Sequence, residues 1–120
     1  MPLSPENPRR IDKPWGYELL FARTPFYAGK LLHIEPGEAL SLQYHEMKEE
    51  TVFVLKGEVV IDVKDDSGMQ ILTLREREGL HIPPGRIHRF RTEAGCDLVE
   101  VSTPHLDDVV RLEDRYGRIP

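Results

Sequence analysis

The sequence predicts an all-β domain of antiparallel strands, organised as a sandwich, a jelly roll or a barrel. Short apolar segments follow one another from residue 30 to residue 102, and turn sequences such as Lys56-Gly57 and Glu78-Gly79 separate them. No long segment shows the 3.6-residue apolar period of a helix. Many short strands at this spacing are typical of closed or two-layered antiparallel folds. The expected strands are residues 30–34, 40–45, 51–55, 59–64, 70–74, 80–83, 88–92 and 98–102.

Length and composition limit the classes of protein to consider. A chain of 120 residues is the size of one domain, and its net charge of −5, with the basic residues scattered among acidic ones, argues against binding nucleic acid. The single cysteine, Cys96, rules out an internal disulfide and suits a reducing compartment. No apolar run approaches the roughly 18 residues of a membrane span. We therefore expect a cytoplasmic protein that binds no membrane and takes a small polar ligand.

The chain divides into three parts. Residues 1–12 include the proline-rich run MPLSPENPRR and are expected to form an extended arm, either disordered or lying on a partner subunit. Residues 13–104 hold the predicted strands. Residues 105–120 are expected to close the sheet with a short amphipathic helix or a turn, since Asp107 and Asp108 favour a helix start and Gly117 a stop.

Four polar residues predict a metal site. Gln43 and His45 alternate with Leu42 and Tyr44 along one strand, so they point to the same face, and Glu50 follows after a tight loop. His88 ends the segment IPPGRIH and completes the set. Two imidazoles, a carboxylate and an amide suit a borderline divalent cation such as Zn, Mn, Fe, Co or Ni, and leave positions open for water or substrate.

Several residues have both a functional and a structural interpretation. Lys30 shares a strand face with Leu32, so it is either an inward ammonium that needs an anionic partner or ligand, or a strand-end lysine that reaches water. Trp15 and Tyr17 are either packing anchors or substrate contacts.

Arginines near the end of the chain are candidate anion ligands. Arg111, Arg115 and Arg118 lie in the closing segment, and a guanidinium matches the geometry of a phosphate.

Segment 51–55 predicts a homodimer. Val52 and Val54 are apolar on one face of this strand, and Phe53 and Leu55 are apolar on the other. In so small a domain, a sheet that is apolar on both faces requires a second layer on one side and a subunit or arm on the other.

The order and spacing of several motifs resemble those of a known family. Residues 36–57, PGEALSLQYHEMKEETVFVLKG, and the segment IPPGRIH resemble the two motifs of the cupin superfamily. More narrowly, KPWGYE, KLLHIEPG, LSLQYH, IPPGRIHR, LVEVS and LDDVVRLEDRYGR resemble the cupin domain of type II mannose-6-phosphate isomerases over residues 13–118. The resemblance implies a single-domain cupin jelly-roll barrel with one metal per chain.

The resemblance also implies an activity, the metal-dependent interconversion of mannose 6-phosphate and fructose 6-phosphate. Gln43, His45, Glu50 and His88 match the family's metal-ligand pattern. Lys30, Arg111 and Arg118 are then candidates for phosphate binding or for stabilising the enediolate, Tyr17 is a candidate substrate contact, and Glu100 is the candidate base, unless it faces solvent.

The loop 46–49 departs from the resemblance. Isomerases of this type usually carry further histidine and an arginine there, whereas this chain has Glu46, Met47, Lys48 and Glu49. We expect a sugar or sugar-phosphate isomerase or epimerase with an altered rim and, lacking a nucleotidyltransferase domain, no pyrophosphorylase activity. A dioxygenase-like cupin and a non-catalytic sugar-binding or sensor cupin are the alternatives.

Overall fold

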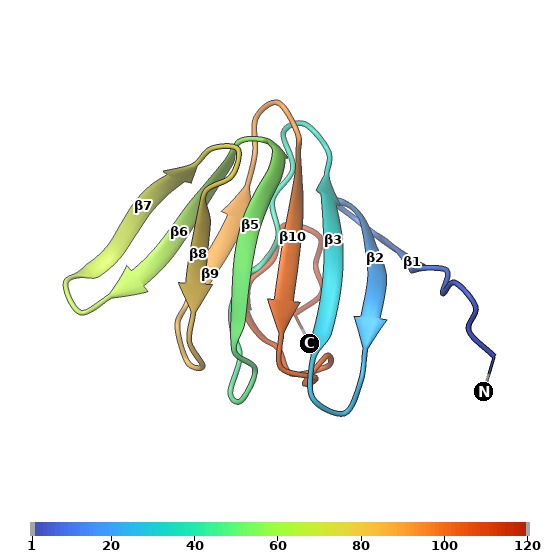
Figure 1. Ribbon diagram of the computed structural model, residues 1–120. Helices are drawn as coiled ribbons and strands as arrows, with labels where there is room; N and C mark the ends of the chain where they lie inside the picture. The colour runs from blue at the N-terminus through green and yellow to red at the C-terminus, as the bar shows by residue number, and fades with distance from the viewer. Residues whose placement is uncertain (1, 120) are drawn as a thin grey trace.

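Two antiparallel sheets face each other in the computed structural model, which describes residues 2–119 (Figure 1). One sheet has six strands in the order β1-β2-β3-β10-β5-β8, and the other has five in the order β11-β4-β9-β6-β7. This arrangement confirms the predicted all-β jelly roll. The strands are β1 (Arg9–Lys13), β2 (Gly16–Arg23), β3 (Ala28–Ile34), β4 (Leu42–Tyr44), β5 (Glu50–Gly57), β6 (Val59–Asp65), β7 (Gly68–Leu74), β8 (Gly79–Ile82), β9 (His88–Arg91), β10 (Cys96–Ser102) and β11 (Val110–Glu113).

The core lies between the two sheets and follows from strand alternation. In β5, Val52 and Val54 are fully buried, while Phe53 and Leu55 between and after them are exposed on the outer face. Ile61 of β6 and Phe90 of β9 meet them from the five-stranded sheet. Burial of such side chains contributes roughly 1.5–3 kcal/mol each, and this core holds the two layers together.

The strand that carries Gln43 is shorter than predicted. Of residues 40–45, only Leu42–Tyr44 form β4. The amide of Leu40 donates instead to the carbonyl of Phe90 at 2.8 Å, and Ala39 forms an isolated bridge with Arg91. This local irregularity lets Leu40 line the same cavity as Gln43 and His45.

The closing segment forms turns and a strand, and residues 2–119 contain no helix. β11 pairs with β4 at the edge of the five-stranded sheet, with Val110 opposite Tyr44 and Arg111 opposite Gln43. Asp108, expected at a helix start, has another role: its carboxylate accepts hydrogen bonds from the backbone amides of loop 46–48. The sequence predicts a short helix or a turn for the closing segment, and the structure has the turn.

The predicted N-terminal arm is partly a strand. Strand β1 begins at Arg9, inside the predicted arm of residues 1–12, and pairs with β2 from Arg9 opposite Leu20 to Lys13 opposite Gly16.

Within the described part of the chain, no helix has the length and apolar character needed to cross a membrane.

Candidate metal centre

A cavity of about 90 Å³ opens between the sheets, and it contains most of the predicted site residues. Both sheets and the loops that join them contribute side chains. The lining residues that carry chemistry are Lys13, Glu18, Lys30, Gln43, His45, Lys48, Glu100, Asp108, Arg111 and Arg118.

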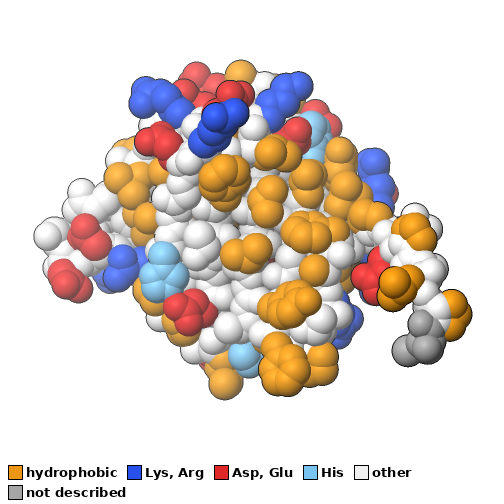
Figure 2. All heavy atoms as spheres, in the orientation of Figure 1, with side chains coloured by type: hydrophobic (Ala, Val, Ile, Leu, Met, Phe, Trp, Pro, Cys, Tyr) orange, Lys and Arg blue, Asp and Glu red, His pale blue; other side chains and the backbone are white. Residues whose placement is uncertain are grey.

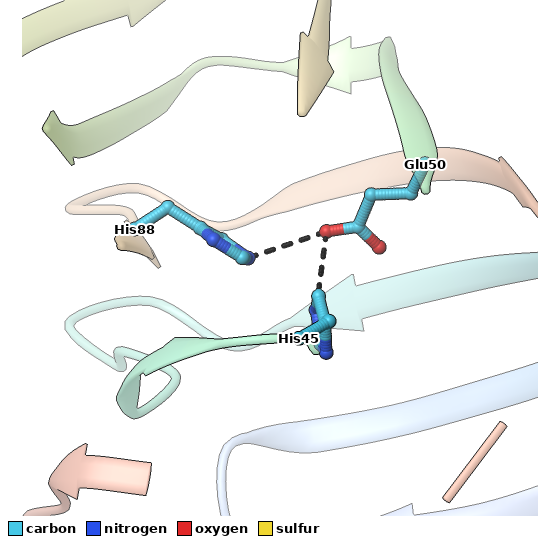
Figure 3. Close-up of side chains that lie close together, drawn as sticks. All are labelled: His45, Glu50 and His88. Carbon is cyan, nitrogen blue, oxygen red and sulfur yellow. Dashed lines mark ion pairs between the residues drawn. The ribbon is translucent and has the colours of Figure 1, made fainter. Parts of the chain in front are cut away.

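Three buried side chains converge beside this cavity, which His45 also lines, and Figure 3 shows them pointing toward one another. His45 follows β4, Glu50 begins β5 and His88 begins β9. Glu50 Oε1 lies 3.5 Å from His45 Nε2 and 3.2 Å from His88 Nε2. One ligand atom from each residue lies within 4.8 Å of the others, a spacing that suits a single ion.

Backbone carbonyls orient both imidazole rings. His45 Nδ1 donates to the carbonyl oxygen of Asp108 at 2.5 Å, and His88 Nδ1 donates to that of Arg86 at 2.8 Å. A carbonyl only accepts, so each Nδ1 carries the proton and each Nε2 of a neutral ring presents its lone pair. Both Nε2 atoms and both Glu50 carboxylate oxygens are buried without a hydrogen-bond partner among the described residues. Buried polar atoms are rarely left unpartnered, and a divalent cation would satisfy these.

Gln43 lies beside this triad. It stands opposite His88 in the β4–β9 pairing and opposite Arg111 in the β11–β4 pairing, so the three side chains form a row on one sheet face. Its Oε1 accepts a hydrogen bond from the Ser41 hydroxyl at 2.7 Å, which leaves a second lone pair on that oxygen. Gln43 thus remains the predicted fourth ligand.

Lys48 is the residue of the site that sequence reasoning missed. Loop 46–49 reads as a charged surface loop, yet Lys48 is only 5% exposed, and its Nζ lies 3.1 Å from Glu50 Oε2 and 3.0 Å from Glu100 Oε2. Asp108 turns the loop inward by accepting bonds from the amides of Glu46, Met47 and Lys48 at 3.0, 2.6 and 2.9 Å. No local pattern signals this burial, because Glu100 and Asp108 lie far from Lys48 along the chain.

The ion pairs around Lys48 set the electrostatics of the site. Burial lowers the pKa of Lys48, but Glu100 and Glu50 raise it by more, so the ammonium stays charged. Burial raises the pKa of Glu50, yet the adjacent side chains of His45, His88 and Lys48 hold that pKa well below its ordinary value. Burial and the neighbouring Glu50 charge raise the pKa of Glu100 to about 8.

The structure places Lys30 and Glu100 on the interior face of the six-stranded sheet. They stand opposite each other in the β3–β10 pairing, and both line the cavity. Glu100 is buried and does not face solvent. Lys30 Nζ lies 3.1 Å from Glu18 Oε2, so the inward ammonium has the anionic partner that its position requires.

Two of the predicted substrate contacts have other partners. Tyr17 does not line the cavity: its ring stacks on His33 with centroids 4.8 Å apart, and Arg10 lies 4.1 Å from the ring centroid. Arg118 does line it, but its Nε and Nη2 donate to the two Asp114 carboxylate oxygens at 2.8 and 2.9 Å. Trp15 is buried in the core, although one edge reaches the cavity.

Comparison with known proteins gives the family. The model of the family described as mannose-6-phosphate isomerase C-terminal matches residues 4–114. The chain belongs to this family. Its curated relatives include mannose-1-phosphate guanylyltransferases from Salmonella typhimurium (36% identical) and Escherichia coli K12 (37%), each over 92% of this chain. Another is the xanthan biosynthesis protein XanB of Xanthomonas campestris, 33% identical over 92% of the chain. The family member described here spans about a quarter of these relatives' length, 23–24%.

Solved structures share the fold at lower identity. Oxalate decarboxylase from Bacillus subtilis superposes with a TM-score of 0.77 at 18% identity, covering 98% of this family member and 33% of that chain. KdgF from Halomonas sp. superposes with a TM-score of 0.71 at 15% identity, covering 81% and 86%. These similarities show the cupin fold alone.

Replacing His88 by alanine tests the ligand set. The H88A variant loses one of the three converging donors, so we expect the bound metal to fall from about one ion per chain to a small fraction of that. Elemental analysis of purified protein measures the content. His81, exposed and 2.6 Å from Glu49, provides the control, and H81A should keep its metal. Full metal content in H88A would show that the ligands are misassigned.

Replacing Lys48 by methionine tests the buried ion pairs. K48M leaves Glu50 and Glu100 without their shared cation, which costs about 3–5 kcal/mol in the metal-free protein. A bound divalent cation replaces the missing charge, so added metal should raise the melting temperature of K48M by more than that of the wild type. Thermal unfolding with chelator and with excess metal measures both effects. An unchanged melting temperature in chelator would contradict the assigned role of Lys48.

Proposed function

We propose that this chain binds one divalent metal ion and isomerises or epimerises a phosphorylated or nucleotide-linked sugar, with mannose 6-phosphate and fructose 6-phosphate as the first candidates. The observation that carries the proposal is the convergence of His45, Glu50 and His88, whose facing atoms are buried without a hydrogen bond among the described residues, next to a cavity lined by His45 and Glu100. Family membership and relatives named for mannose 1-phosphate support a sugar phosphate as the substrate class.

Aldose–ketose isomerisation moves a proton between C2 and C1 and passes through an enediolate. A base removes the proton from one carbon and returns it to the other, while a cation stabilises the negative oxygen. Bound at the triad, with Gln43 as a fourth ligand, the metal would act as that Lewis acid.

Glu100 is the proposed base. It lines the cavity, and its pKa is raised to about 8 by burial and by Glu50. Lys48 lies 3.0 Å from its carboxylate and keeps it oriented. Lys30, opposite Glu100, is the proposed second cation for the enediolate, and Arg118, which lines the cavity and is bound by Asp114, is a further candidate. Tyr17 remains a candidate substrate contact, although it stacks on His33 and does not line the cavity.

Isotope exchange tests the activity. Metal-loaded protein in deuterated water without oxygen should incorporate deuterium at C2 of mannose 6-phosphate or C1 of fructose 6-phosphate, as nuclear magnetic resonance detects. E100Q should exchange about 10²–10⁴-fold more slowly while keeping its metal. E49Q changes an exposed carboxylate on the same loop and should exchange normally.

Two outcomes of this experiment would count against the isomerase. One is the absence of exchange with a panel of aldose and ketose phosphates. The other comes from a parallel assay in air, where oxygen consumption by protein loaded with iron or manganese would favour the dioxygenase alternative. The same donor set of two imidazoles, one carboxylate and one amide accepts such metals.

We also propose that the chain forms a homodimer through the outer face of its six-stranded sheet. Leu19, Leu31, Val99 and Phe53 face one another across β2, β3, β10 and β5 and form one apolar row. Figure 2 shows apolar side chains gathered over this sheet, where Phe21, Leu55 and Val101 are also exposed. A flat apolar sheet face is complementary to an identical one, as in stacked sheets, and ill suited to a polar sugar.

Substitution within this apolar face tests the dimer. V101K introduces a charge at a side chain that is 52% exposed, so folding should be unaffected while association is lost. Light scattering at micromolar concentration should give twice the chain mass for the wild type and one chain mass for V101K. I71K, on the other sheet at 69% exposure, should stay dimeric. A wild type that weighs one chain mass would remove the proposal.

A further inference from the structure

Five cationic side chains line the cavity, and four of them lie within 4.0 Å of a carboxylate oxygen. Lys30 pairs with Glu18 at 3.1 Å, and Lys13 lies 4.0 Å from the same carboxylate. Lys48 lies between Glu50 and Glu100, and Arg118 is held by Asp114. Arg111 is the fifth, and within residues 2–119 it has no carboxylate partner.

Arg111 lines the cavity, and its side chain is only partly exposed to solvent. It lies on the edge strand β11, is half-buried, and its Nε is buried without a hydrogen-bond partner among the described residues. A buried guanidinium nitrogen that donates to nothing is unfavourable, because its hydration is lost and not replaced. An oxyanion bound in the cavity would supply the missing acceptor.

The separation between Arg111 and the candidate metal site sets the length of a ligand that could contact both. Arg111 stands opposite Gln43, and Gln43 stands opposite His88, so the guanidinium and the triad are two strand spacings apart on one face. Two spacings amount to about 10 Å between backbones, and the side chains reach toward each other from there. A hexose bearing one phosphate is long enough to bridge the two positions.

We infer that Arg111 is the anion-binding residue of this cavity and takes the phosphate of a ligand whose other end reaches the His45–Glu50–His88 site. Lys30 and Arg118 stay in their ion pairs with Glu18 and Asp114. A guanidinium binds a phosphate through two parallel N–H···O bonds, and it does so better where water is partly excluded. The inference rests on the proposed function for the sugar part of the ligand, but binding of the anion does not require turnover.

Calorimetric titration of the full-length protein, with metal and with chelator, tests the inference. The probes are inorganic phosphate, fructose 6-phosphate, neutral fructose and gluconate. R111M should weaken binding of phosphate and of fructose 6-phosphate by about 10- to 100-fold. R111K, which keeps the charge but not the fork, should fall between R111M and the wild type, and binding of fructose should be unchanged. R75M removes an exposed arginine from another part of the surface and should match the wild type.

Two results would overturn the inference. Wild-type phosphate affinity in R111M, with the melting temperature preserved, would show that another cation binds the anion. A wild type that binds gluconate but not phosphate through Arg111 would identify a carboxylate ligand. Arg111-dependent binding of fructose 6-phosphate without isotope exchange would leave this inference standing and reject the isomerase.

Discussion

The buried ion pairs of Lys48 are the interaction on which the site depends. Glu50 and Glu100 are two buried carboxylates that contact the same ammonium, an arrangement that strongly disfavours ionisation of both unless a cation lies between them. Lys48 supplies that cation and contacts Glu50 through Oε2, so Oε1 is left facing the two histidines. A single lysine therefore keeps one carboxylate charged, orients it and separates it from its neighbour.

Asp108 provides the structural support for this arrangement. Its carboxylate gathers three successive amides of loop 46–48, and its carbonyl orients His45, so one residue of the closing segment fixes both Lys48 and a metal ligand. The main-chain bonds hold the pKa of Asp108 below its ordinary value, beginning with the bond from Met47. The closing segment thus belongs to the site as much as to the fold.

The cationic side chains of the cavity differ in whether a carboxylate lies close by, and this difference distinguishes structural residues from candidate ligand-binding ones. Lys30 and Arg118 resemble anion ligands in sequence, but each already has a carboxylate close by. Arg111 has none within the described residues, and its row with Gln43 and His88 joins the anion position to the metal position across three strands. Preorganised donors of this kind bind a ligand without the cost of reorganisation.

The sequence by itself determined the elements and the first set of ligands. Alternation in segments 40–45 and 51–55 predicts which side chains turn inward, and the spacing of Gln43, His45 and Glu50 predicts a metal half-site, since both properties depend on near neighbours in the chain. Only the tertiary structure decided which charges meet. The contacts of Lys48 with Glu100, Lys30 with Glu18 and Asp108 with loop 46–48 depend on the register of strands far apart in sequence. No local pattern encodes that register, so the burial of Lys48 and the place of Arg111 in the row with Gln43 and His88 follow only from the assembled sheets, whereas the pair of Arg118 with Asp114 is local.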